Sequence, residues 1–235
     1  MNGKAIIKFL VVIAAIIGLF AYFIQPLAGS LKQGLDLQGG THIVLEAEDS
    51  ATGQADNDAV ERAKQILERR INEMGLSEPL VQREGARRII IELPGVKDPD
   101  EAIKRIGKTA VLEFKNDQGQ TVMTGDDLKD AKEELGQNKQ PLVAIELSDE
   151  GAKKFADLTS KNIGRRIAIT LDGKELTNPV VQQAITGGKA TISGSQSLEE
   201  AKDLAILLRS GALPVKINVL EVRTVGPSLG QDSKD

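Results

Sequence analysis

The chain has 235 residues, of which 40% are hydrophobic and 27% charged, as in an ordinary folded protein of one large or two small domains. Its net charge of −4 argues against a nucleic-acid-binding domain, which is normally basic. Cysteine is absent, so disulfides and thiolate metal sites are excluded. Beyond residue 24 only Phe114 and Phe155 are aromatic, too few for a surface that stacks single-stranded bases.

A hydrophobic segment over residues 5–24 is predicted to anchor the chain in a membrane. Its length corresponds to about 30 Å of helix, enough to cross the hydrocarbon core. Its Leu, Ile, Val and Phe residues favour insertion by roughly 4–8 kcal/mol. Lys4 and Lys8 at its start place the N-terminus in the cytoplasm and the following domain outside it. A cleaved signal peptide is the alternative, although "QPLAGS" is a poor match to a cleavage site.

The stretch "LKQGLDLQGGTHIVLEAE" (31–48) follows this segment. It lacks the G-x-x-x-x-G-K-[ST] pattern of a phosphate loop. Its glycines Gly34, Gly39 and Gly40 are therefore expected to allow tight or positive-φ backbone where the domain begins. His42 is the only histidine of the chain, so neither a His-based triad nor a two-His metal site can form. From Ile43 onward the alternation of apolar and polar residues predicts a strand.

The next part of the chain completes a predicted β-α-β-β-α-β order. Apolar residues at three- and four-residue steps over 56–74 predict a helix that ends at Gly75. Two short strands are expected on either side of Gly85, and Asp98 with Pro99 marks the start of a second helix. With a strand in "TAVLEFK", this order favours a sheet with helices on one face, in an α+β fold.

The second half is predicted to be a mixture of strands and capped helices. Ser148 and Ser197 each stand at the start of a helical pattern, and Gly211 ends the second of these helices. Over 126–135 the polar sequence is interpreted as a possible short helix. Strands are expected in "PLVAIEL", "RRIAITLDGK", "TNPVVQQAITGGKATISGS" and "LPVKINVLEVRTVG".

No set of residues for catalysis, metal binding or cofactor binding emerges from the sequence. The acidic group around 126–134 does not have the spacing of a calcium loop and is interpreted as the solvated face of a helix. The Gly- and Ser-rich stretch 186–195 is expected to be a turn or mobile loop. A membrane-anchored chain without a catalytic set is more typical of a binding or moving element than of an enzyme.

Six motifs in order along the chain resemble the SecD family, membrane subunits of the bacterial Sec protein-export machinery. They are "GLDLQGGTHIVLE", "LPG", "EGAKKFADLT", "TNPVVQQAITGGKATISG", "AKDLAILLRSGALPVK" and "VGPSLG". The resemblance covers nearly the whole chain and agrees with the predicted topology. The motif residues expected to have structural roles are Asp36, Gly39, Gly40, Gly211, Gly226 and Pro227.

The resemblance implies a domain organisation. After an anchor at 1–29, a ferredoxin-like base is expected at 30–113 and 213–225, with an α+β head inserted at 114–212. Residues 226–235 would begin the link to a second membrane helix, so that the chain is expected to be an N-terminal fragment without the family's proton-relay helices. The hinge between base and head is expected at Glu113, Phe114, Leu213 and Pro214.

The resemblance also implies a function outside the cytoplasm at the cell membrane. Members of this family pair with SecF beside the SecYEG channel and use the proton gradient to assist the movement of unfolded preprotein. The head would contact the preprotein and swing on the base. The sequence leaves an alternative open, a membrane-anchored module that binds a small ligand or a peptide.

Overall fold

We describe a computed structural model of the chain over residues 13, 39–49, 53–76, 79–96 and 98–226. Within these residues no helix is both long enough and apolar enough to cross a membrane. The predicted anchor lies outside the described residues apart from Ile13, as do Asp36 and Pro227.

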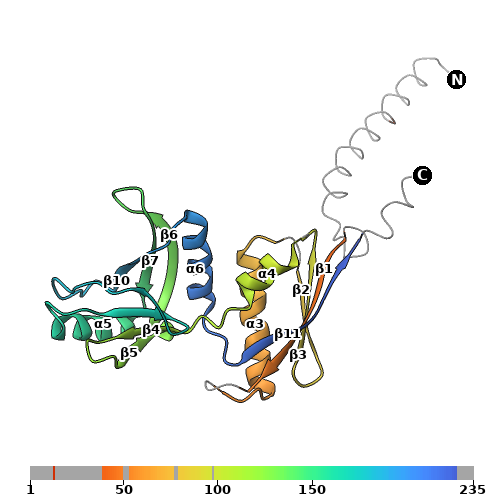
Figure 1. Cartoon of the computed structure of the whole chain (residues 1–235), viewed down its shortest axis with the longest axis horizontal. Helices are drawn as coiled ribbons and strands as arrows, with labels where there is room; N and C mark the ends of the chain where they lie inside the picture. Colours follow the sequence, from red (N-terminus) through yellow and green to blue (C-terminus); the bar gives the residue numbers. More distant parts are fainter. Residues whose placement is uncertain (1–12, 14–38, 50–52, 77–78, 97, 227–235) are drawn as a thin grey trace. The chain divides into compact units, whose positions relative to one another are not determined.

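The first sheet has four antiparallel strands in the order β11-β1-β3-β2, so the last strand of the chain pairs with the first (Figure 1). Helices α3 and α4 provide its apolar cover, and with it they form one buried cluster of side chains. The strands are β1 (Gly40–Glu48), β2 (Leu80–Glu84), β3 (Arg88–Pro94) and β11 (Lys216–Val225), and the helices are α3 (Asn57–Glu73) and α4 (Pro99–Ile106).

The predicted helix over 56–74 is confirmed as α3. The carboxylate of Asp56 accepts a hydrogen bond from the Ala59 amide at 2.7 Å and caps its first turn. Leu67 and Ile71 of its apolar stripe are fully buried. Gly75 follows the helix with φ of +73°, a conformation that glycine adopts without steric cost.

The second cluster of buried side chains is built from two further sheets and two helices. One sheet has the order β5-β4-β8-β9 and the other β10-β7-β6, all antiparallel. Their members are β4 (Leu112–Lys115), β5 (Thr121–Thr124), β6 (Leu128–Leu135), β7 (Pro141–Leu147), β8 (Ala168–Leu171), β9 (Lys174–Thr177), β10 (Lys189–Ser193), α5 (Asp149–Lys161) and α6 (Leu198–Ser210).

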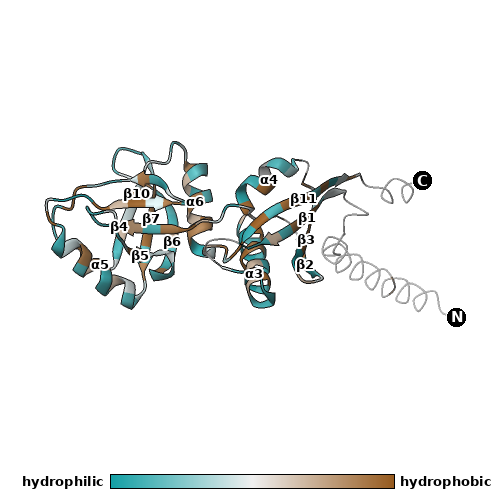
Figure 2. Ribbon diagram, turned by 60° about the horizontal axis from the view of Figure 1, so that its bottom comes forward, coloured by the Kyte–Doolittle hydropathy of each residue, from teal (hydrophilic) through white to brown (hydrophobic). Residues whose placement is uncertain are grey.

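Both helices of this part begin at their predicted caps. The Ser148 hydroxyl accepts from the Gly151 amide, and the Ser197 hydroxyl accepts from the Glu200 amide, each at 3.1 Å. Helix α6 lies along β6 and β7, and apolar residues alternate with polar ones along the strands (Figure 2).

The expected short helix over 126–135 is wrong. The structure has one turn of 3₁₀ helix, η1 (Gly125–Asp127), followed by strand β6. Ala131, the one buried side chain of β6, lies opposite Ile145 of β7, and the hairpin closes through the Gly136 amide and the Gln140 carbonyl at 2.9 Å. The polar sequence has no helical apolar stripe to bury, so pairing with the apolar strand β7 decides its conformation.

Candidate functional site

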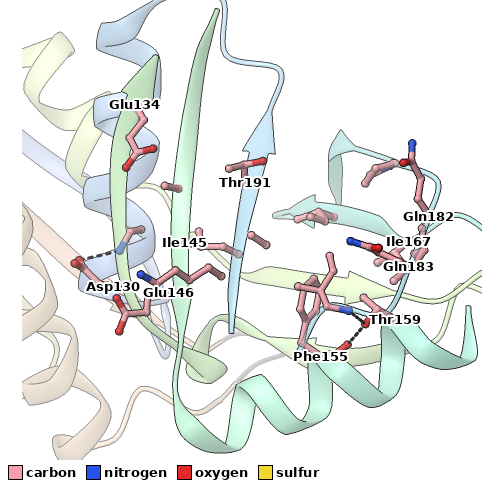
Figure 3. A pocket seen from close by; sticks show the side chains of 18 of the residues that line it. Asp130, Glu134, Ile145, Glu146, Phe155, Thr159, Ile167, Gln182, Gln183 and Thr191 are labelled. Carbon is pink, nitrogen blue, oxygen red and sulfur yellow. Dashed lines mark hydrogen bonds between the residues drawn. The ribbon is translucent and has the colours of Figure 1, made fainter. Parts of the chain in front are cut away.

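A groove of about 770 Å³ opens in the second cluster (Figure 3). It gathers residues from β6, β7, α5, β8, β10 and the segment 179–185. A second cavity, of about 680 Å³, has charged residues at four of its ten lining positions, against five of twenty in the groove. This groove is therefore the candidate binding site of the described part of the chain.

The floor of the groove is apolar. Ile145, Phe155, Ile167 and Ile169 line it, and each is at most 5% exposed. Phe155 packs edge-to-face on Phe114, with ring centroids 6.0 Å apart, so the floor is continuous with the core beneath it. Such a floor favours apolar side chains of a ligand.

The β6 and β7 side of the groove carries charges that are paired with one another. Asp130 lies 3.0 Å from the Lys132 ammonium, and Glu146 lies 2.6 Å from that of Lys129. The hydrogen bond from Lys132 lowers the pKa of Asp130, and the one from Lys129 lowers the pKa of Glu146. Both carboxyl groups are therefore ionised at neutral pH, and neither has the raised pKa of a general acid.

The opposite wall is the segment 179–185, which backbone hydrogen bonds hold in place. The Val181 amide donates to the Arg165 carbonyl at 2.9 Å, and the Ile185 amide donates to the Thr159 hydroxyl at 3.0 Å. The side chains of Gln182 and Gln183 are exposed on this wall (Figure 3). A fixed wall with free amide groups can offer both hydrogen-bond donors and acceptors.

The acidic residues singled out in the sequence are divided between the groove and the structure beneath it. Asp130 and Glu134 line the groove, whereas Asp127 is buried and pairs with Lys154 at 2.9 Å. They lie on a 3₁₀ turn and a strand, so their interpretation as one helix face is wrong. No group of three metal-ligating side chains occurs among the residues that the structure describes.

A second region with a distinctive arrangement is the junction where the chain passes between the two clusters. The side chain of Arg70, on α3, is fully buried there. It donates to the Ile106 carbonyl at 2.7 Å, the Gly211 carbonyl at 2.8 Å, the Ser210 hydroxyl at 3.1 Å and the Lys108 carbonyl. One guanidinium thus holds both stretches of chain that connect the clusters. Burial lowers the pKa of Arg70 to about 10, so it remains charged at neutral pH.

The first connection is also held by Asp172, in the turn between β8 and β9. Its carboxylate accepts from the Ala110 amide at 3.1 Å and from the Val111 amide at 2.9 Å. Ala110 has φ of +60°, which is uncommon for a residue with a side chain. The two connections touch each other where the Leu213 amide donates to the Thr109 carbonyl at 2.8 Å.

Ion pairs join helices of the two clusters beside this junction. Arg209 of α6 contacts Glu73 of α3 at 2.8 Å, and Arg105 of α4 contacts Glu199 of α6 at 2.6 Å. Arg209 also donates to the Ala131 carbonyl of β6 at 2.6 Å. These contacts are partly exposed, in contrast to those of Arg70.

The residues expected at the hinge lie on either side of these connections. Glu113 and Phe114 are in β4, where the Glu113 carboxylate accepts from the Thr121 hydroxyl at 2.8 Å and Phe114 is fully buried in the second cluster. Leu213 is buried in the first cluster and Pro214 follows it. The residues between the two buried clusters are 107–111 and 211–212.

The glycines of the recognised motifs have definite backbone roles where the structure describes them. A Cβ on Gly40 would lie 2.3 Å from the Leu93 carbonyl oxygen, so no other residue fits beside β3. Gly39 has φ of +66° and its carbonyl accepts from the Gly95 amide at 2.9 Å. Gly211 has φ of +88° at the end of α6, and Gly226 is the last described residue.

His42 has a structural position. Its Nδ1 lies 3.4 Å from the Glu92 carboxylate on the neighbouring strand, and both side chains are about one-third exposed. It does not line the groove.

Three family profiles match the sequence. "SecDF, P1 head subdomain" matches residues 103–215, "Protein translocase subunit SecDF, P1 domain, N-terminal" matches residues 60–119, and "SecD/SecF GG Motif" matches residues 31–51. The second cluster and its groove lie within the match to the head subdomain.

Full-length relatives and solved structures agree with these profiles. "Protein translocase subunit SecD" of Acidaminococcus fermentans is 58% identical over 235 residues, which is 100% of this chain and 56% of that protein. The "Crystal structure of SecDF in Super-membrane-facing form" has a TM-score of 0.76 at 42% identity, covering 86% of this chain and 32% of that one. A second structure, "Structure and function of a membrane component SecDF that enhances protein export", has a TM-score of 0.70 at 40% identity, covering 77% and 99%. The chain spans about half the length of the curated relatives that it matches.

Proposed function

The chain belongs to the SecD family of protein translocase subunits, and on this premise we propose that it assists protein translocation by binding unfolded preprotein in the groove. The observation that carries the proposal is the groove itself, with an apolar floor, paired charges and two exposed glutamines. An unfolded secreted chain exposes apolar side chains and unpaired backbone groups in any sequence. A surface with apolar contacts and no dominant charge binds such chains with little sequence preference.

The same proposal covers the location of the protein and its assembly with partners. The domain is extracytoplasmic, the segment 5–24 anchors it in the cell membrane with the N-terminus in the cytoplasm, and the complete subunit works with SecF and the SecYEG channel. The charge of Lys4 and Lys8 and the names of the relatives support this arrangement. The proton gradient drives the complete complex. The described residues supply the contact with preprotein and no catalytic step.

The domain organisation is proposed as a ferredoxin-like base that carries an inserted head. The base sheet has the order fourth-first-third-second when its strands are numbered along the chain, with two helices between them, which supports this fold. Leu112 and Phe114 pack in the second cluster, which moves the proposed hinge from Glu113 and Phe114 to residues 107–111. In the second connection, which leads from the head back to the base, the proposed hinge moves from Leu213 and Pro214 to residues 211–212.

Chemical shift perturbation tests the binding proposal. The full chain in detergent micelles is titrated with an unfolded preprotein segment and, in parallel, with a folded protein of similar size. We expect shifts of the amides lining the groove with the unfolded segment alone. Equal shifts with both partners, or shifts with neither, would contradict the proposal.

A pair of variants locates the site. Ile185→Ser removes an apolar side chain of the groove wall, and Val122→Ser removes an exposed apolar side chain of β5 outside the groove. We expect Ile185→Ser to weaken binding about fivefold or more and Val122→Ser to leave it within twofold. A screen with small ligands that shifted the same amides more strongly than preprotein would favour the small-ligand module instead.

A further inference from the structure

Strand β10 forms one edge of its sheet, and the orientation of its backbone groups follows from its pairing with β7. The register places Lys189 opposite Glu146, and the Leu147 amide donates to the Gly188 carbonyl at 2.8 Å. Because hydrogen-bonded and non-bonded pairs alternate along an antiparallel ladder, every second residue from Gly188 directs its backbone groups to β7. The N–H and C=O groups of Lys189 and Thr191 therefore point to the free edge.

The groove runs along this edge. Three successive residues of β10 line it, Lys189, Ala190 and Thr191. Phe155, Gln182 and Gln183 also line the groove and lie on the side of β10 that faces away from β7, so the groove passes the free edge of this strand (Figure 3). Figure 3 shows Thr191 on one wall, and Gln182 and Gln183 on another.

The edge-facing groups of Lys189 and Thr191 have no backbone partner in the part of the chain that the structure describes. The other edge of the same sheet differs, because the Ala131 carbonyl of β6 accepts a hydrogen bond from Arg209. The β10 edge is thus open at Lys189 and Thr191, whereas the β6 edge is occupied at Ala131.

Strand β9 approaches β10 at its far end. The hydroxyls of Thr177 and Ser193 are 3.3 Å apart, and a Cβ on Gly194 would lie 2.9 Å from the Leu176 carbonyl oxygen. The free stretch of the edge is therefore the part that contains Lys189 and Thr191, beside the apolar floor.

We propose that an extended segment of polypeptide binds in the groove as an added strand on β10, with its main chain hydrogen-bonded to Lys189 and Thr191. The inference rests on the proposed function and specifies how the same groove recognises its ligand. Edge N–H and C=O groups at strand spacing are complementary to the main chain of an extended polypeptide, which carries the same groups at the same spacing.

This mode of binding accounts for recognition without sequence preference. Main-chain hydrogen bonds are the same for every sequence except at proline. Alternate side chains of the added strand face the apolar floor, and the others face the charged rim or solvent, so apolar residues at every second position strengthen the contact.

N-methylated peptides test the proposal directly. A short unfolded peptide with apolar residues at alternate positions is compared with two N-methylated versions of itself. In one version the amides that point to one edge of the extended chain are methylated, and in the other version the amides that point to the opposite edge. Binding to the full chain in detergent micelles is measured by fluorescence anisotropy. We expect one methylated version to lose about tenfold or more in affinity, because only one edge of the peptide faces β10, and the other to bind within about threefold.

A pair of protein variants gives an independent readout. Thr191→Pro removes an edge-facing N–H that takes no part in the pairing with β7, and Thr191→Ala keeps it. We expect Thr191→Pro alone to weaken peptide binding, by about tenfold. Hydrogen exchange of the Ala190 and Ile192 amides reports whether the sheet remains formed. If the sheet is not formed in the Thr191→Pro variant, the comparison of the methylated peptides decides whether the ligand binds by strand addition.

The outcomes separate this inference from the proposed function. If the unmodified peptide shifts the groove amides and both methylated versions bind equally well, strand addition is overturned and the groove still binds polypeptide. If the unmodified peptide and unfolded preprotein both leave the groove amides unchanged, the proposed function itself fails, and strand addition with it.

Discussion

The junction and the groove differ in whether their polar groups have hydrogen-bond partners within the protein. At the junction, the fully buried Arg70 donates to three carbonyls and one hydroxyl, and Asp172 accepts from two backbone amides. In the groove, the edge of β10 has no backbone partner among the described residues, and Gln182 and Gln183 are exposed. Buried polar groups that are all paired favour one arrangement of the chain, whereas open ones are available to a ligand.

This difference indicates that the junction stabilises the fold and that the groove is the part available for binding. The chain connections are held by hydrogen bonds, most of them made by the fully buried Arg70, while the groove keeps apolar and polar groups accessible at the surface. Substitutions at the junction should therefore change stability, and substitutions at the groove should change binding with little effect on stability.

The largest effect is expected from Arg70→Met. The substitution keeps much of the apolar volume but leaves buried carbonyls of both connections without a donor, which should lower the free energy of unfolding by about 3–5 kcal/mol. Urea denaturation followed by circular dichroism measures this change.

Arg69→Met is the matched control, since Arg69 is the exposed neighbour of Arg70 on the same helix. Its effect should stay within about 0.5 kcal/mol. A loss of less than about 1 kcal/mol for Arg70→Met would show that the junction does not depend on the buried cation.

A smaller effect is expected from Arg209→Met, because the side chain of Arg209 is about one-quarter exposed. The variant loses the contact with Glu73 and the hydrogen bond to the Ala131 carbonyl, at a cost of about 1–2 kcal/mol in the free energy of unfolding. Lys202→Met, which removes an exposed cation from the same helix, should change stability by about 0.5 kcal/mol at most. Equal effects of the two variants would mean that the ion pair between α3 and α6 contributes nothing.

Much of the fold could be predicted from local sequence patterns. The caps at Ser148 and Ser197, the stripe of α3 and the strand β7 depend on residues close together in the chain, and all are confirmed. Strand β6 could not be predicted in this way. Its eight residues are mostly charged, and only the pairing of Ala131 with β7 shows which face is buried.

The junction left a signal in the sequence. The pair Arg69–Arg70 is most simply interpreted as exposed charges, which is wrong for Arg70. Arg70 lies within the apolar stripe of α3, beside Leu67 and Ile71, and a charged residue in such a stripe must find buried partners. Its partners lie up to 141 residues away along the chain, so they could not be named. The groove left no local signal, because its walls come from elements spread between Asp130 and Thr191.

The smallest effect expected is a dependence of stability on pH through Asp130, on the rim of the groove. The hydrogen bond from Lys132 lowers the pKa of this carboxyl in the folded state. The folded state then binds fewer protons than the unfolded chain, so the pair stabilises the fold above about pH 4 and loses this contribution as the pH falls through the folded-state pKa. Because Asp130 is partly exposed and its partner Lys132 is mostly exposed, screening by solvent should limit the contribution to a few tenths of a kcal/mol.

Asp130→Asn removes the titrating group and should make the acid side of the stability curve slightly less steep. The measurement is the free energy of unfolding in urea at intervals from pH 6 to pH 3, with Glu134→Gln on the same strand as the control. A much larger change with Asp130→Asn would show that the rim is held as tightly as the junction, and the contrast between the two regions would be lost. A small change in the free energy of unfolding at acid pH, together with unaltered stability at neutral pH, would strengthen the contrast between the junction and the groove. The paired charges of the rim would then be available to a ligand at little cost to the stability of the fold.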